Sequence, residues 1–451
     1  MAGGTWTSQN KVLPGVYINV SSQGSVTPAI TSRGVVAMAE PLSWGPTGVI
    51  SEYLPGQDPT PLIGYPLSAP QALFLNEIFR GSNRTAPPVT LYLYRPEGSN
   101  GKKATATSGE LTATALYEGV RGNDISIIVS QEPDEGENYT VETVVSGTVV
   151  DSQTITDLSQ LVANDWVTFS GTGTAITKTA GTALANGADP TVSEADYANF
   201  LTLLEPYQFD ILIYDGTDST TMSAIASFVE RVSNNIGQKC QAVMAANTDA
   251  NSEFVISVKN GITLQDGTQL TPQQATWWIG GTEAGATYYQ SLTYAQHPYA
   301  IAANPKLTEN QLIEAVQAGQ IAFTDSFDTV KILQDINTLT TFTEDTGQEF
   351  SKNRVMRVLM TLCNDTFNYF SNTFIGATSN NADGRDLLRA WLVQYLNEMQ
   401  ANGGIQDFSA EDVTVNPGDT LESVLINVVV HPVDSIEKIY MSITVSLNVE
   451  S

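Results

Sequence analysis

An alternation of helix and strand patterns in the middle of the sequence constrains the fold more than any other feature. Ser193 is a suitable N-cap for the first helix of this series. Helix, strand, helix and strand then follow one another over 193–204, 209–214, 222–235 and 240–245. Strands that alternate with helices form parallel or mixed sheets with helices on their faces. We therefore predict an α/β unit over 189–345, with the first part of its core in 31–100.

The regions on either side of this unit have different patterns. Between 101 and 188 Thr, Val, Gly and Ser dominate and short alternating runs recur, which predicts an all-β insertion. From 346 to 451 two long amphipathic helices precede two strands, 421–430 and 439–449, which predicts an α+β unit. Residues 1–30 are rich in small polar residues and are expected to form an extended arm.

The last strand pattern, Ile439–Val449, is regular over its whole length. Met441, Ile443, Val445, Leu447 and Val449 alternate with polar residues, as in a half-buried strand. Chain ends fray unless something holds them, so this strand needs a partner, either in its own subunit or in a neighbour. Edge strands also pair within one chain, and the sequence leaves both possibilities open.

Composition excludes several classes of partner. The 451 residues include 20 Lys and Arg against 48 Asp and Glu, a formal charge of −28. Nucleic acids and anionic membrane surfaces require a basic surface, so neither is an expected partner. No apolar run is long enough to span a membrane and no secretory signal is visible, which indicates a soluble protein made in a cytoplasm. Cys240 and Cys363 are expected to be buried thiols in a reducing compartment.

Catalytic chemistry has little support in the sequence. A Ser-His-Asp site would need His297 or His431, with Asp215 at the end of an apolar strand, but Asp215-Gly216 is more typical of a turn. The stretch 98–103 departs from a phosphate-binding loop, and the acidic run 132–137 lacks calcium-ligand spacing. We predict no catalytic, cofactor-binding or metal site.

Several segments together resemble the contractile tail sheath proteins of myophages and R-type bacteriocins. Leu13-Pro14-Gly15-Val16-Tyr17-Ile18 is similar to the entry strand of that family, and Arg33-Gly34-Val35-Val36 follows the small-residue arm. The most similar part is C-terminal. It comprises Asn353–Val358, Gly384–Asp386 and Pro432–Tyr440. The order of β insertion, α/β unit and C-terminal α+β unit also agrees, so the resemblance covers nearly the whole chain.

The resemblance implies a mechanical function without cofactors. Sheath subunits stack as hexameric rings around a tail tube, and contraction drives the tube through a bacterial envelope. The implied partners are further copies of the chain, the tube protein, and the baseplate and tail terminator proteins. The central domain would be subtilisin-like without catalytic residues. Assembly would take place in the bacterial host cytoplasm, and the product would be the tail of a virion or of a headless bacteriocin.

The resemblance also implies which residues make contacts between subunits. Terminal strands would add to the sheets of neighbouring copies through Val16, Tyr17, Ile18, Val20, Met441, Ile443, Val445, Leu447 and Val449. Four arginines of the C-terminal helices are expected to contribute to a tube-facing surface, although pairing with local carboxylates is an equal alternative. They are Arg354, Arg357, Arg385 and Arg389.

Two other classes of protein compete with this interpretation. One is an α/β enzyme of hydrolase type with a β-rich appendage, which requires a pocket and a titratable group. The other is a β-rich structural protein of a cell surface, which requires export. Electron microscopy distinguishes the three, because only the sheath interpretation predicts tubes or stacked rings.

Overall fold

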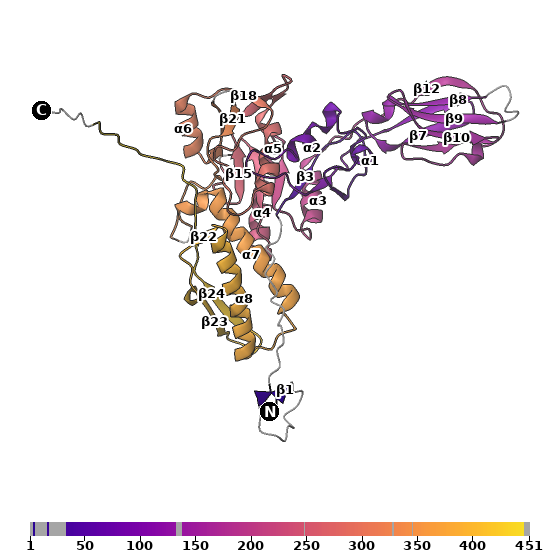
Figure 1. Cartoon of the computed structure of the whole chain (residues 1–451). Coiled ribbons are helices and arrows are strands. Elements are labelled where there is room, and N and C mark those ends of the chain that lie inside the picture. Colours follow the sequence, from indigo (N-terminus) through magenta and orange to yellow (C-terminus); the bar gives the residue numbers. More distant parts are fainter. Residues whose placement is uncertain are drawn as a thin grey trace.

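The computed structural model describes residues 3–4, 16–17, 33–131, 138–247, 249–326, 329–344 and 346–445. Figure 1 shows a central α/β unit from which a β-rich unit projects to one side. A helical C-terminal unit extends below it, and the last described residues leave the body on the side opposite the β-rich unit. The mixed, multidomain architecture predicted from the sequence is confirmed.

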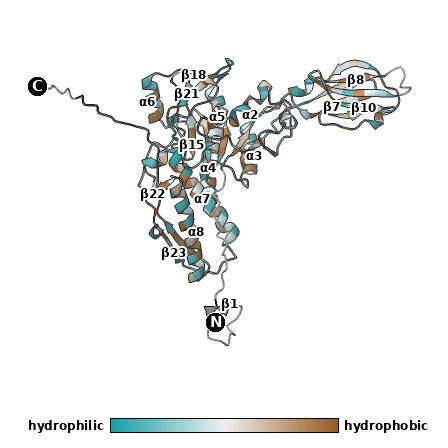
Figure 2. Cartoon of the chain, viewed as in Figure 1, coloured by the Kyte–Doolittle hydropathy of each residue, from teal (hydrophilic) through white to brown (hydrophobic). Residues whose placement is uncertain are grey.

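The central unit is built on a sheet of seven strands in the order β19–β15–β14–β13–β3–β5–β4. Every neighbouring pair is parallel except β4 and β5. In this order the strands are Gln320–Ile321, Val255–Val258, Gln241–Ala245, Ile211–Tyr214, Val35–Ala39, Thr90–Tyr94 and Ile50–Tyr53. Figure 2 shows hydrophobic residues concentrated in these strands, as expected for a sheet that is covered on both faces.

Helices cover both faces of the sheet and create two cores. On one face α5 packs against α2 and the central strands, and on the other α3 and α4 pack together. Met356 and Met360 of the C-terminal unit complete the second core. The helices of the central unit are α1 (Thr60–Ile63), α2 (Leu73–Ile78), α3 (Glu194–Leu204), α4 (Ser219–Arg231), α5 (Pro272–Gly285) and α6 (Glu309–Gln317).

The helix starts follow from capping chemistry. At the starts of α5 and α6, Thr271 and Thr308 each accept a hydrogen bond from the backbone of the Gln three residues later. A π-helical segment, Val232–Ile236, continues α4 and ends at Gly237, which adopts a left-handed conformation. The central unit also contains two small sheets, one of three strands and one of two. Their strands are β16 (Gly261–Leu264), β17 (Gln269–Leu270), β18 (Ala300–Asn304), β20 (Phe323–Ser326) and β21 (Thr329–Ile332).

The β-rich unit is a sandwich of two sheets, ordered β10–β9–β8–β12 and β11–β7–β6. Its strands are β6 (Lys103–Ser108), β7 (Leu111–Glu118), β8 (Ile125–Ser130), β9 (Tyr139–Val145), β10 (Thr148–Ile155), β11 (Val167–Ser170) and β12 (Thr179–Ala183). Trp44 enters the sandwich core, 4.8 Å from the ring of Trp166 and 5.3 Å from that of Tyr117. A residue of the α/β segment therefore anchors the base of the projecting unit.

The C-terminal unit pairs two long helices with short hairpins. Its elements are α7 (Asn353–Thr373), α8 (Ala382–Ala401), β22 (Ile405–Gln406), β23 (Val413–Pro417), β24 (Val424–Val428) and β25 (His431–Pro432). Stacking of Trp391 on Tyr369, with ring centroids 4.3 Å apart, joins the two helices. The predicted strand 421–430 is β24. Its partner β23 was not predicted, because Val413–Pro417 is short and ends in proline.

The remaining short elements are 3₁₀ turns at Pro70–Ala72, Val120–Asp124, Leu158–Gln160, Gln348–Ser351 and Ala410–Asp412. The two predicted buried cysteines differ. Cys240 is buried, and burial raises the pKa of its thiol to about 12, whereas Cys363 is exposed, so the prediction for Cys363 was wrong. It lies on the side of α7 that faces solvent.

A glycine in α5 provides a test of this packing. A Cβ added at Gly281 would lie 1.9 Å from the carbonyl oxygen of Ile78, the last residue of α2. We expect Gly281→Ala to lower the free energy of unfolding by about 1–3 kcal/mol through overpacking, measured by urea denaturation. Ser227→Ala, on an exposed position of α4, is the control. Equal midpoints for the two variants would contradict the α2–α5 contact.

Candidate functional site

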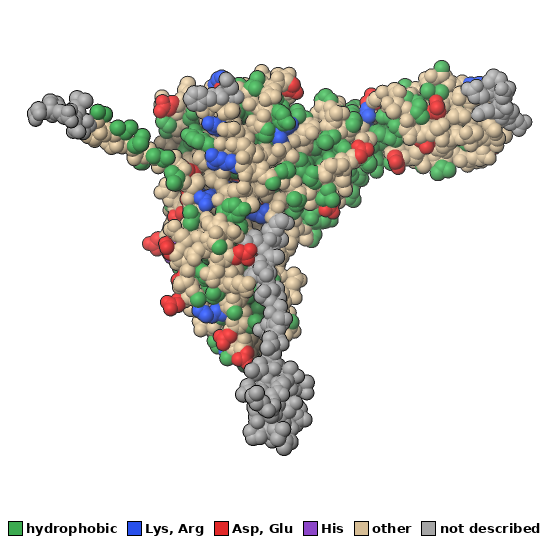
Figure 3. Space-filling model, viewed as in Figure 1, with side chains coloured by type: hydrophobic (Ala, Val, Ile, Leu, Met, Phe, Trp, Pro, Cys, Tyr) green, Lys and Arg blue, Asp and Glu red, His purple; other side chains and the backbone are tan. Residues whose placement is uncertain are grey.

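The C-terminal arm, defined here as residues 439–445, is the most unusual surface of the described chain. Ile439, Tyr440, Met441, Ile443 and Val445 are between 75% and 91% exposed. Figure 3 shows these apolar side chains along a segment that leaves the body. The expected strand is not formed, because the arm leaves before it meets any sheet edge in the described structure. Leu447 and Val449 lie outside the described residues.

The hairpin β23–β24 is a candidate receiver for such a segment. Its two strands pair only with each other in the described structure, so each has an outer edge without a strand partner. Val415 and Ile426 pack against the core of the C-terminal unit, whereas Leu425 and Val429 are 56% and 53% exposed. A free edge with an apolar outer face is typical of sheets that accept an additional strand.

The N-terminal strand expectation is met only in part. Val16 and Tyr17 form strand β2, which pairs in parallel with β1 (Gly3–Gly4) of the same chain. The described part of this predicted strand, Val16 and Tyr17, therefore has a partner in its own chain. Ile18 and Val20 lie outside the described residues, so their proposed role stays a prediction.

The four arginines predicted to face a tube have different environments. Arg357 is 0% exposed, so the prediction that it faces a tube was wrong. Arg354, Arg385 and Arg389 are partly exposed and bind polar groups of their own unit. Arg354 donates to the Gly403 carbonyl, Arg385 to the Asn380 side chain, and Arg389 to the carbonyls of Val413 and Ala410. For these three, contact with a tube stays a prediction.

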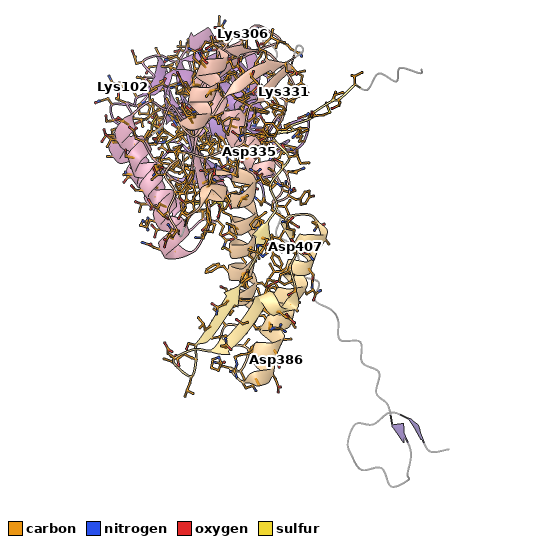
Figure 4. All side chains as sticks on the ribbon, turned by 90° about the vertical axis from the view of Figure 1, so that its left-hand side faces the viewer. Lys102, Lys306, Lys331, Asp335, Asp386 and Asp407 are labelled. Atoms are coloured by element: carbon orange, nitrogen blue, oxygen red, sulfur yellow. The ribbon has the colours of Figure 1, made fainter. Side chains whose placement is uncertain are left out.

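Arg357 belongs to a buried ion cluster that joins the two units. The Arg357 cluster, defined as Arg357, Glu283 and Asp335, contains one guanidinium between two carboxylates, each at most 1% exposed. Arg357 pairs with Glu283 of α5, binds Asp335 at 2.7 Å and donates to the Gln290 carbonyl at 2.7 Å. In Figure 4 Asp335 lies where the central unit meets the C-terminal unit.

The two carboxyl groups of the Arg357 cluster differ in proton affinity. Burial raises the pKa of Glu283, and the neighbouring charge of Asp335 raises it further. Burial opposes ionisation of Asp335 as well, but Arg357 and several hydrogen bonds lower the pKa of that carboxyl. The sequence did contain a signal for this cluster, since Arg357 and Glu283 are single charges within otherwise apolar helical runs.

The residues considered for catalysis are not brought together. His297 is buried, and its Nε2 lies 2.8 Å from Glu77, whereas Asp215 accepts a hydrogen bond from the Trp277 indole at 2.9 Å. His431 is exposed in β25. The described residues contain no group of three or more metal-ligating side chains. None of the described helices is long and apolar enough to cross a membrane.

Two carboxyl groups do meet at the end of the central sheet. Glu40 follows β3 and Asp215 follows β13, the neighbouring strands at which the strand order reverses. Ligands of open α/β sheets bind at this position. Burial and the adjacent Asp215 raise the pKa of Glu40 well above its ordinary value, and burial raises that of Asp215. The Trp277 indole donates a hydrogen bond to Asp215, which favours the ionised form of Asp215 over that of Glu40.

Comparison with known proteins is consistent across the whole chain. Residues 99–189 match the phage tail sheath protein beta-sandwich domain, 191–338 the central domain and 345–446 the C-terminal domain. Phage-like element PBSX protein XkdK of Bacillus subtilis is 31% identical over 99% of this chain and 100% of that protein.

Solved structures agree with the sequence matches. A sheath tail protein from Desulfitobacterium hafniense is 41% identical, covers 96% of this chain and 100% of its own, and superposes with a TM-score of 0.85. The helical sheath of the anti-feeding prophage, in its contracted state, shares the fold at 13% identity, with a TM-score of 0.57 over 96% of this chain and 99% of its own. These matches define the class, a structural subunit of a contractile injection system. Within that class, the chain belongs to the phage tail sheath protein family.

The Arg357 cluster predicts a large effect of single substitutions. Arg357→Met leaves two buried carboxyl groups without their cation, so we expect it to lower the free energy of unfolding by about 3–5 kcal/mol. Replacing Glu283 and Asp335 by Gln and Asn in the same chain should restore part of the loss. Urea denaturation measures both. Arg231→Gln, which breaks the exposed pair with Glu205, is the control and should change little.

The Glu40–Asp215 pair predicts a pH-dependent stability. Because the pKa of Glu40 in the folded state exceeds its ordinary value of 4.5, the unaltered chain loses stability as the pH rises from that value through the folded-state pKa. Glu40→Gln lacks this loss, so its thermal midpoint should rise relative to the unaltered chain between pH 4 and pH 8. Glu110→Gln in an exposed turn should show no such trend, and a pH profile of Glu40→Gln that runs parallel to that of the unaltered chain would contradict the raised pKa of Glu40.

Proposed function

We propose that this chain polymerises as stacked hexameric rings around a tail tube, and that contraction of the polymer drives the tube through a bacterial envelope. Its partners are further copies of itself, the tube protein, the baseplate and the tail terminator. Assembly takes place in the cytoplasm of the bacterial host before the particle is released. The proposal applies equally to an infectious phage and to a headless bacteriocin.

The exposed C-terminal arm is the observation that carries this proposal. Five apolar side chains of residues 439–445 are uncovered in the isolated chain, and burying each on a neighbour would contribute about 1.5–3 kcal/mol. Strand addition to the free edge of β23–β24 on another copy supplies backbone hydrogen bonds worth about 0.5–1.5 kcal/mol each. A contact in which an arm of one copy binds a different surface of the next does not close on itself, so it propagates into a helical polymer.

Each unit of the chain has its own proposed role. The central unit serves as a subtilisin-like support without catalytic function, and the β-sandwich is an insertion in it. The C-terminal unit assembles the polymer, with Arg354, Arg385 and Arg389 as candidates for contact with the tube. The boundaries are an arm at 1–30, core segments at 31–100 and 189–345, the insertion at 101–188 and the assembly unit at 346–451.

The arm can be tested directly by removing it. A chain that ends at Lys438 should fold with an unchanged thermal midpoint, because residues 439–445 are exposed, but it should form no tubes or rings in negative-stain micrographs. Ile443→Asp combined with Val445→Asp should have the same effect. Ser442→Ala combined with Thr444→Ala alters the polar positions of the same segment and is the matched control.

Three outcomes would contradict parts of the proposal. Tubes from the shortened chain would exclude the arm as the connector. Misfolding of the shortened chain would indicate pairing within one subunit. Compact monomers of the unaltered chain at high concentration would count against the sheath function as a whole.

A further inference from the structure

The Glu437 side chain, two residues before the C-terminal arm, binds three side chains of the body. Its carboxylate accepts hydrogen bonds from the Thr293 hydroxyl and the Gln334 side-chain amide, both at 2.6 Å, and pairs with the Lys352 ammonium. The Glu437 side chain is only 11% exposed. Ile436 and Ile439, on either side of it, are 85% and 82% exposed. The arm is therefore held at a point directly before it leaves the body.

Hydrogen bonds connect this point to the Arg357 cluster. Thr293 Oγ1 donates to Glu437 and accepts from the backbone N–H of Asp335 at 3.0 Å. The Asp335 carboxylate in turn binds Arg357. Each step joins two defined atoms, so the arm and the buried cluster are parts of one polar network.

A second route leads to the same cluster along α7. Lys352, which pairs with Glu437, is the residue at the N-cap of α7. The next residue, Asn353, is buried and donates to Glu283 at 3.3 Å. A displacement of Glu437 therefore acts on both partners of Arg357 and on the first turn of α7.

We propose that Glu437 is a positioning residue that sets the direction of the C-terminal arm and transmits a pull on the arm to the Arg357 cluster. This inference rests on the proposed function, because the pull comes from the neighbouring copy that holds the arm. An arm held in one direction loses less conformational freedom when it binds, so the anchor favours assembly. A pull also reaches the junction of the two units instead of unravelling the short β22–β25 pair.

Glu437→Gln tests the proposal with little change in shape, and Glu110→Gln in the β-sandwich is the matched control. The first measurement is the rate of tryptic cleavage after Lys438, which needs the preceding residues to detach. The second is the lowest concentration of full-length chain that gives tubes, measured by sedimentation and negative-stain microscopy. For Glu437→Gln we expect the cleavage rate and the lowest tube-forming concentration each to rise about tenfold. For the control we expect both quantities to stay unchanged. The thermal midpoint of the body should be the same in both variants.

The outcomes separate this inference from the proposed function. Unchanged cleavage overturns the anchor, and faster cleavage with an unchanged threshold concentration overturns its role in assembly. If the unaltered chain forms no tubes at any concentration, the proposed function fails, while the cleavage rates still decide whether Glu437 holds the arm. Thr293→Val, alone and combined with Glu437→Gln, tests the route to Asp335, since fully additive effects on the threshold concentration would overturn it.

Discussion

The placement of the C-terminal unit depends on one guanidinium that is buried between two carboxylates. Arg357 of α7 pairs with Glu283 of α5 and with Asp335 after β21. Removing any one of the three groups would leave a buried charge without its partner, which is strongly destabilising. Such a cluster adds little net stability compared with apolar packing, but it accepts only one position of α7 on the central unit. Because α8 packs on α7 and β23 packs on α8, the cluster also sets where the hairpin edge lies relative to the central sheet.

A second buried polar contact continues this arrangement along α7. The Tyr395 hydroxyl of α8 donates to Asp365 of α7 at 2.7 Å, and burial raises the pKa of that phenol. A carboxylate also holds the backbone near residue 33, where the continuous described chain begins. There Asp210 accepts the backbone N–H groups of Gly34 and Val35 at 2.9 and 3.0 Å. One carboxylate thus holds the chain at the entrance to β3, and Glu437 holds it where the C-terminal arm leaves.

Local sequence patterns predicted helices and strands, but they did not predict which residues of other elements those helices and strands contact. The helices α3 and α4 and the strands β13 and β14 followed from capping residues and apolar periodicity, because burial repeats with the period of the element. Arg357 was misassigned because a charge on a helix is usually exposed, and only the fold brings Glu283 and Asp335 to it. The C-terminal arm has the pattern of a paired strand, yet residues 439–445 pair with no strand of the described chain. Under the proposed function, its partner lies in another molecule.

An α/β sheet of this type suits the proposed mechanical function. At the reversal of strand order, where related architectures bind ligands, Asp215 accepts a hydrogen bond from the Trp277 indole and the Glu40 carboxyl lies beside it. The sheet is expected to act as a rigid support, because its parallel strands are covered on both faces. The polar contacts with consequences for assembly lie instead at the junction with α7 and at Glu437. Under the proposed function the subunit moves as a body while its connections hold, which requires a stiff interior and extended segments that are held where they leave the body.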